Sequence, residues 1–179
     1  MEDVVRLSTI AKEEDPEKPF ILLGDSMGSF AAQQYVLDHS YSLDGLALSG
    51  SGALDGLMRL AKSAPPGEDD ILNAPFVPAH TSFDWLSRDP AVVDAFMNDP
   101  LCFGALQPAA NESFFAAPSE LADPSRLRQD LPIYLFSGSE DPVGQQLEGV
   151  SLLTDRYHKA GIRNICYHFY PGGPKRNAQ

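Results

Sequence analysis

The sequence predicts an α/β fold: a mainly parallel β-sheet with flanking helices and a helical cap insertion. Short, continuous apolar runs alternate with helix-like segments at both ends of the chain, and a stretch rich in Pro, Ala and Asp separates the two regions. Strands that alternate with helices form right-handed βαβ units and a parallel sheet. We therefore expect a core over residues 1–50 and 128–173, the cap insertion over 51–127, and an atypical tail over 174–179.

The first half of the core begins with an apolar run from Phe20 to Leu23 that stops at Gly24. Such a run is typical of a strand buried on both faces of a parallel sheet. Residues 30–37 carry apolar side chains at helical spacing and predict a helix, and residues 46–48 predict a second buried strand.

The same alternation returns in the second half of the core. Residues 133–136 predict a strand, residues 147–160 a helix that Gly161 closes, and residues 165–170 another strand.

Two short helices are expected in the insertion. One begins near Thr81, with Asp84 three residues later as its capping partner. The other has Asp89 at the cap and Pro90 at its first position. Its side chains expected to face inward are Val92, Val93, Phe96 and Met97.

Charge and composition exclude several classes of partner. The chain has 25 acidic and 13 basic residues, a net charge of −12, which argues against nucleic acid and anionic membranes. It has no signal-like N-terminus and no apolar stretch long enough to span a membrane, so a cytoplasmic protein is expected. Cys102 and Cys166 lack metal-ligand or CxxC spacing, which favours two buried or half-buried thiols over a disulfide or a zinc site.

A candidate nucleophile stands between the first strand and the first helix of the core. Gly24-Asp25-Ser26-Met27-Gly28 fits the pattern G-x-S-x-G in the strand–turn–helix context of a nucleophile elbow. Ser26 is then the nucleophile, and the backbone N–H of Met27 is the first donor to an oxyanion. The alternative is a glycine-rich turn that binds no substrate.

A candidate acid follows the later strand. Glu140 and Asp141 lie just beyond residues 133–136, so both emerge at the same sheet edge as Ser26. We prefer Asp141 because Pro142 fixes the turn after it, although Glu140 remains a rival and a solvated loop pair remains the alternative interpretation.

Three stretches carry a resemblance to a known family: LLGDSMGSF at 22–30, TSFDWLSRDP at 81–90 and LPIYLFSGSEDPVG at 131–144. With them the chain resembles the monoacylglycerol lipase and lysophospholipase group of the α/β-hydrolase superfamily, which is similar to serine aminopeptidase S33. The resemblance implies a partial α/β-hydrolase fold and a serine esterase that cleaves small monoacylglycerol or lysophospholipid-type esters in lipid metabolism. It also implies a covalent acyl-enzyme, with no metal and no organic cofactor.

The chain departs from the family pattern at the catalytic histidine. In the family this residue follows a Tyr-Pro-Gly-Gly turn, whereas here Pro171-Gly172-Gly173 leads to a segment without histidine. His168 is the nearest substitute for the base, ahead of His39, His80 and His158. Asp25 stands where the family usually has histidine. The family's early strands would precede Met1, so the chain is expected to be truncated at both ends.

Two hypotheses follow. In the first, the chain is an esterase whose cap aromatics Phe83, Trp85 and Phe96 cover an acyl-chain pocket, unless they form only the cap core. In the second, the chain is a catalytically incompetent fragment or a non-enzymatic remnant. Either way, an unpaired edge at residues 20–23 predicts self-association.

Overall fold

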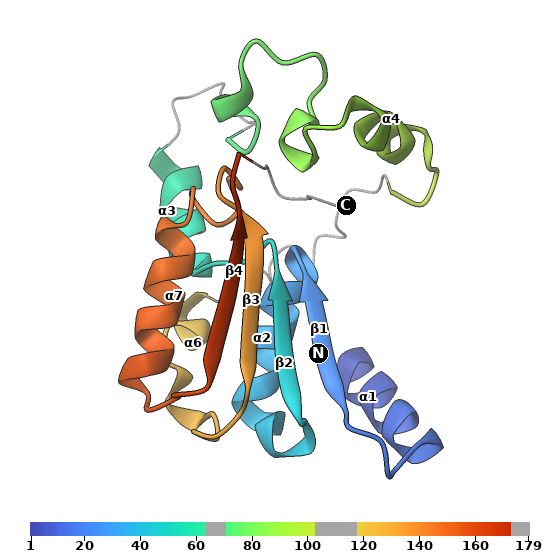
Figure 1. Cartoon of the computed structure of the whole chain (residues 1–179), viewed down its shortest axis with the longest axis vertical. Helices are drawn as coiled ribbons and strands as arrows, with labels where there is room; N and C mark the ends of the chain where they lie inside the picture. The colour runs from blue at the N-terminus through green and yellow to red at the C-terminus, as the bar shows by residue number, and fades with distance from the viewer. Residues whose placement is uncertain (64–70, 103–117, 173–179) are drawn as a thin grey trace.

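The computed structural model describes residues 1–63, 71–102 and 118–172 and contains one four-stranded sheet. Its strands are β1 (Ile21–Asp25), β2 (Gly45–Ser49), β3 (Ile133–Gly138) and β4 (Ile165–Tyr170), paired in chain order and parallel throughout. Figure 1 shows them side by side. The prediction of a parallel α/β sheet is confirmed, and each strand begins and ends within two residues of its expected limits.

The helices connect and flank these strands. They are α1 (Glu2–Glu14), α2 (Met27–His39), α3 (Leu54–Ser63), α4 (Pro90–Asn98), α6 (Pro118–Leu121) and α7 (Glu148–Lys159). Short 3₁₀ turns occur at η1 (Ser40–Ser42), η2 (Ala74–Phe76), η3 (Asp84–Leu86) and η4 (Pro124–Arg126). The expected core helices correspond to α2 and α7.

The hydrophobic core lies between one face of the sheet and helices α2, α3, α6 and α7. Leu46 and Leu48 of β2 and Leu135 of β3 point to this face and are buried. They pack with Val36 of α2 and Leu153 of α7 in the same cluster. Figure 1 shows α2 and α6 behind the sheet. Apolar side chains at helical spacing in these helices and at alternate positions in the strands therefore meet in one layer.

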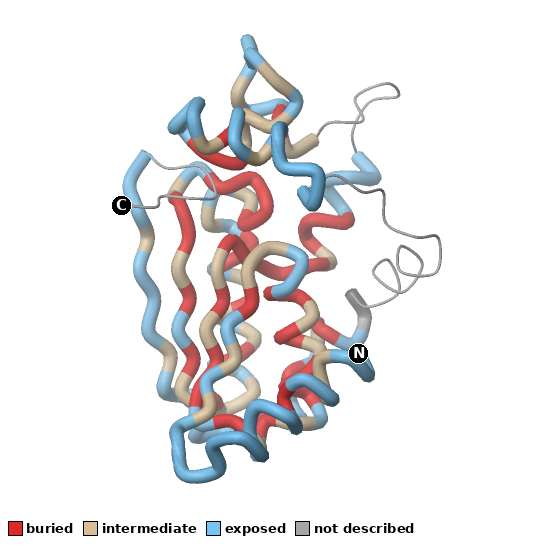
Figure 2. The backbone as a smooth tube through the Cα atoms, turned by 90° about the vertical axis from the view of Figure 1, so that its right-hand side faces the viewer, coloured by how far each residue is buried: buried red, intermediate tan, exposed pale blue. Residues whose placement is uncertain are grey.

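The opposite face of the sheet is open in the described part of the chain. Ile21 and Leu23 of β1 are each 61% exposed, and Tyr134 of β3 and Cys166 of β4 are exposed on the same face. Figure 2 colours β4 largely as exposed. Parallel sheets are normally covered on both faces, so an exposed apolar face and the edge at β1 are surfaces through which a second chain could pair. Self-association stays a prediction, which light scattering would test.

Residues 71–102 of the expected insertion lie above the carboxyl ends of the strands (Figure 1), whereas α3 and α6, which also fall within 51–127, pack with the hydrophobic core. The Asp89 side chain accepts a hydrogen bond from the N–H of Ala91, and Pro90 begins α4, so this helix start is confirmed. The α-helix expected near Thr81 is wrong: the structure has the 3₁₀ turn η3 there. The expected capping contact is present, because the Asp84 carboxylate accepts hydrogen bonds from the N–H of His80 and from the N–H and hydroxyl of Thr81.

Three expectations about side-chain burial are wrong. The strand expected to be buried on both faces of the sheet, β1, leaves Ile21 and Leu23 exposed on one face. Met97 of α4 is exposed, and Val93 is the buried residue of this helix. Cys102 and Cys166 are free but exposed: the first follows α4 in the insertion, and the second lies on the open sheet face. The domain limits stay predictions, since residues 64–70 and 103–117 of the insertion and the tail 174–179 lie outside the described residues.

An ion pair joins α3 to α7 on the covered side of the sheet. Both guanidinium nitrogens Nη1 and Nη2 of Arg156 donate to the Asp55 carboxylate, at 2.7 and 2.9 Å. The two side chains are only 19% and 21% exposed. The Arg156 hydrogen bond, helped by Arg59, holds the pKa of Asp55 well below its usual range.

We expect Arg156→Met to reduce the free energy of unfolding at pH 7 by about 1–2 kcal/mol. Because folding lowers the pKa of Asp55, the pair stabilises fully above the unfolded value near 4 and loses its effect as pH falls through the lower folded value. Urea unfolding should therefore show a smaller difference in the free energy of unfolding between the wild type and Arg156→Met at pH 3 than at pH 7. Arg126→Met, which breaks an exposed pair with Asp38, is the control; equal losses in both variants would contradict the assignment.

Candidate active site

The candidate nucleophile occupies a strained turn between β1 and α2. Ser26 has φ 56° and ψ −124°, a backbone conformation that L-residues other than glycine rarely adopt. The structure holds it there, because the Ser26 N–H donates to the carbonyl of Ser49 at 2.9 Å and the Ser26 carbonyl accepts from the N–H of Ser29 at 2.8 Å. Such strain costs on the order of 1–3 kcal/mol and clusters at active sites.

Close packing of α2 against β1 explains one of the two glycines of the motif. A Cβ atom on Gly24 would lie 2.5 Å from the Gly28 carbonyl oxygen and 2.7 Å from the Ser29 Cα. A Cβ atom on Gly28 would meet nothing within 4 Å. The close approach of strand and helix therefore requires a residue without a Cβ atom at Gly24 and not at Gly28.

The candidate oxyanion donor belongs to the first residue of α2. Met27 begins this helix, where backbone N–H groups have no acceptor within the helix and the helix dipole is positive. Its side chain is exposed. An oxyanion formed beside the Ser26 hydroxyl would thus meet the Met27 N–H.

The candidate acid is completely buried in the loop after β3. The Asp141 side chain accepts hydrogen bonds from the Ser137 hydroxyl at 2.6 Å and from the Val143 N–H at 2.9 Å, and its exposure is 0%. The neighbouring Glu140 is exposed. Of the two carboxylates that the sequence offered, only Asp141 is held in a fixed orientation. The contact with Ser137 was missed in the sequence, although the four-residue spacing S-G-S-E-D brings both side chains into one turn.

The candidate substitute base is distant from the nucleophile. The strand register pairs Asp25 with Ser49, Ser49 with Phe136, and Phe136 with His168. Adjacent strands lie about 4.8 Å apart, so three spacings separate His168 from Asp25 by about 14 Å. The His168 ring is exposed and contacts the ring of Tyr170. The structure does not bring this imidazole to the Ser26 hydroxyl.

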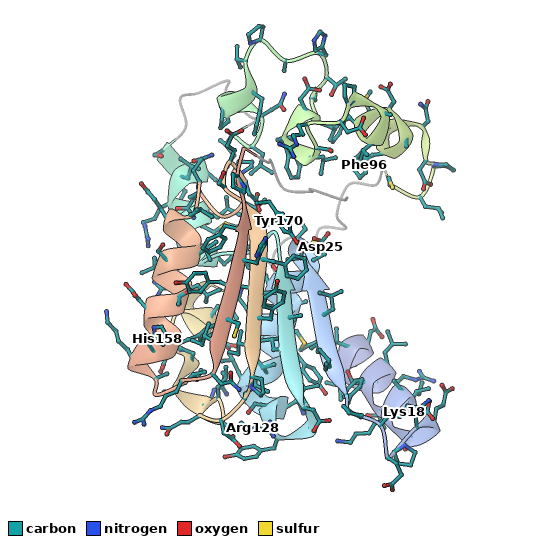
Figure 3. The ribbon with its side chains drawn as sticks, in the orientation of Figure 1. Lys18, Asp25, Phe96, Arg128, His158 and Tyr170 are labelled. Atoms are coloured by element: carbon teal, nitrogen blue, oxygen red, sulfur yellow. The ribbon has the colours of Figure 1, made fainter. Side chains whose placement is uncertain are left out.

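The other histidines lie farther from the carboxyl end of the sheet or in the insertion. His39 ends α2 and stacks on Tyr35. His158 lies near the end of α7, toward the opposite end of the sheet from Asp25 (Figure 3). His80 is exposed in the insertion. All four histidines of the sequence belong to the described residues, and none of them is placed beside Ser26.

The aromatic side chains of the insertion pack in two places. The rings of Phe83 and Phe96 are 5.4 Å apart, and Trp85 packs against the hydrophobic core. Figure 3 shows Phe96 above the end of the sheet at which Asp25 and Tyr170 lie. A cavity of about 320 Å³ lies elsewhere, between α1 and the end of α2, and is lined by residues such as Lys12 and Tyr35.

Comparisons with known proteins agree with this architecture. The family model described as serine aminopeptidase, S33 matches residues 1–174. A thermostable carboxyl esterase from Bacillus coagulans is similar in structure, with a TM-score of 0.79 and 28% identity over 97% of this chain. This chain spans 63% of that esterase. A search of curated protein sequences gives no match.

Two further solved structures share the fold. The monoacylglycerol lipase of Paleococcus ferrophilus has a TM-score of 0.68 and 19% identity over 98% of this chain and 66% of its own. A soluble variant of the monoglyceride lipase of Saccharomyces cerevisiae has a TM-score of 0.64 and 15% identity over 95% of this chain and 60% of its own. Within residues 1–63, 71–102 and 118–172, no helix is both long and apolar enough to cross a membrane.

Proposed function

Because the chain belongs to the serine aminopeptidase S33 family of α/β-hydrolases, we propose that it is a serine hydrolase that cleaves carboxylic esters at Ser26. The observation that carries the proposal is the strained backbone of Ser26 at the junction of β1 and α2. This conformation exposes a hydroxyl at the carboxyl edge of a parallel sheet, where open α/β sheets bind ligands.

The proposed reaction follows from the placement of the groups. The Ser26 Oγ attacks the ester carbonyl carbon, and the Met27 N–H donates a hydrogen bond to the oxyanion that forms. The proton of the Ser26 hydroxyl passes through water to the departing alkoxide, which leaves as the alcohol. Water then adds to the carbonyl of the acyl-enzyme, the carboxylic acid is released, and one water proton returns to the Ser26 Oγ. Asp141 serves as the triad acid, a role that orients and stabilises a cationic imidazole. No metal or organic cofactor takes part in this proposal.

We further propose monoacylglycerol or lysophospholipid-type esters as substrates, in a cytoplasmic enzyme of lipid metabolism. The ring pair of Phe83 and Phe96 lies near the carboxyl end of the sheet, which supports the proposal that the substrate carries an apolar acyl chain. Two neighbours of the same fold are named as lipases of monoacylglycerols. The net charge of −12 argues against nucleic acid as a partner.

A second candidate function is a catalytically incompetent chain. The observation that favours it is the register that places His168 three strand spacings from β1, so that the proton of the Ser26 hydroxyl has no imidazole beside it among the described residues. Loss of the base leaves only on the order of 10³-fold acceleration over water.

We expect the purified chain to hydrolyse p-nitrophenyl butyrate, and Ser26→Ala to remove this activity because no other group would form the acyl-enzyme. A fluorophosphonate probe should label Ser26, as mapped by peptide mass. Ser63→Ala, which changes an exposed serine at the end of α3, is the matched control and should keep full activity.

Three results would decide between the candidates. Hydrolysis that survives in Ser26→Ala, or label on another serine, would refute the role of Ser26. A folded wild-type chain that neither hydrolyses the ester nor takes up the label would support the incompetent chain instead.

A further inference from the structure

A buried hydrogen-bonded chain of side chains leads from the loop after β2 to the nucleophile turn. The Gln33 Nε2 lies 2.9 Å from the Ser51 Oγ, the Ser51 Oγ lies 2.8 Å from the Ser29 Oγ, and the Ser29 Oγ lies 2.5 Å from the Ser26 carbonyl oxygen. Ser29, Gln33 and Ser51 are at most 3% exposed. We call these three residues the polar relay.

Only one direction of donation satisfies all three contacts. Each serine hydroxyl carries a single proton, and a carbonyl oxygen can only accept. The short contact to the Ser26 carbonyl therefore uses the proton of Ser29, so the Ser51 hydroxyl must donate to Ser29. Gln33 in turn donates to Ser51, and its second amide proton reaches the Gly52 carbonyl at 3.2 Å. Hydrogen bonds aligned in this way polarise and strengthen one another.

The relay ends on the peptide group that carries the proposed oxyanion donor. The carbonyl of Ser26 and the N–H of Met27 belong to the same planar peptide, so a hydrogen bond that fixes one of them orients the other. The Ser26 carbonyl also accepts from the Ser29 N–H. The two bonds together oppose rotation of this peptide away from the strained conformation of Ser26.

We infer that Gln33, Ser51 and Ser29 are positioning residues that orient the Met27 N–H toward the oxyanion by anchoring the Ser26 carbonyl. The role of the Met27 N–H in this inference rests on the proposed function. The orientation of the Ser26-Met27 peptide rests only on the hydrogen bonds of the polar relay. A serine that bonds the carbonyl three residues earlier is a common local feature. Here Ser51 extends that bond into the loop after β2, 22 residues away, and Gln33, one turn further along α2, holds Ser51 in turn; both are buried.

A labelling scheme particular to this sequence observes the peptide directly. Ser26-Met27 is the one Ser-Met step in the chain, so ¹³C-carbonyl serine combined with ¹⁵N-methionine gives a single coupled signal from this peptide. We expect Ser51→Ala to shift the Ser26 carbonyl signal upfield, because its hydrogen bond from Ser29 weakens. Ser29→Ala should shift the signal in the same direction and further, and the double variant should resemble Ser29→Ala because the relay acts as a unit.

The amide signals of Met58 and Met97 are internal references, and they should stay in place in Ser51→Ala. Ser63→Ala is the matched control, since it removes the same type of serine-to-carbonyl bond, to Leu60, at the end of α3. It should leave the Ser26 carbonyl signal unchanged. A folded Ser51→Ala chain with an unchanged Ser26 carbonyl signal would overturn the inference, and Ser29→Ala provides the second test if Ser51→Ala does not fold.

The steady-state kinetics of Ser51→Ala distinguish a positioning role of the relay from a purely stabilising one. We expect Ser51→Ala to lower the rate of acylation by p-nitrophenyl butyrate about tenfold with KM unchanged, less than the 10²–10³-fold loss on removing an oxyanion donor. A changed KM with an unchanged kcat would overturn the positioning role. If the wild-type chain does not hydrolyse the ester, the proposed function fails, and the carbonyl signal still decides whether the relay orients the peptide.

Discussion

The Gly24→Ala variant is expected to lose most or all of its folded population. The new Cβ atom would lie 2.5 Å from the Gly28 carbonyl oxygen and 2.7 Å from the Ser29 Cα, and both are backbone atoms of α2. Backbone atoms cannot rotate aside as a flexible side chain can, so α2 must separate from β1 and open the core behind it. We expect a loss of more than about 4 kcal/mol, a large share of the stability of a small domain.

Gly28→Ala is the matched control for this prediction. It adds the same methyl group two positions from the nucleophile on its other side, where no atom lies within 4 Å. Alanine is also the better helix former, so stability should stay the same or rise by up to about 1 kcal/mol. Urea unfolding followed by circular dichroism compares the two variants. Similar unfolding curves for both variants would show that the close contact of Gly24 with α2 does not determine the stability of the fold.

The Asp141→Asn variant is expected to fold but to lose about 10⁴-fold in ester hydrolysis, provided that an imidazole completes the triad in the active enzyme. The asparagine carbonyl can accept from the Val143 N–H, and its amide can donate to the Ser137 oxygen, so both buried contacts survive in altered form. The negative charge required of a triad acid is lost. The initial rate with p-nitrophenyl butyrate and the urea midpoint measure the two effects separately.

Glu140→Gln is the control, because the sequence left Glu140 as the rival acid and the structure exposes it. It should leave both rate and stability unchanged. Asp141→Ala, by contrast, should also cost about 1–3 kcal/mol, since it leaves the Ser137 hydroxyl and the Val143 N–H buried without this acceptor. A large loss of rate in Glu140→Gln with none in Asp141→Asn would reverse the assignment.

The features that the sequence predicts correctly depend on local patterns. The strands, the helix that follows the nucleophile and the start of α4 at Asp89 and Pro90 each depend on residues within one short segment. Apolar runs, helical spacing and capping side chains act over a few residues, so they can be recognised before any folding is known. The position of Ser26 between strand and helix belongs to the same class of information, and so does the family resemblance that the comparisons confirm.

Contacts between segments far apart in the sequence determined the features that local patterns could not predict. The relay joins Ser51 to Ser29 and Gln33 across 22 and 18 residues, and no spacing rule predicts such a contact. The register of four strands decided that His168 lies far from Ser26, although both stand near strand ends in the sequence. Burial likewise distinguishes Asp141 from the exposed Glu140, because exposure depends on which elements pack over a side chain and not on its neighbours in sequence.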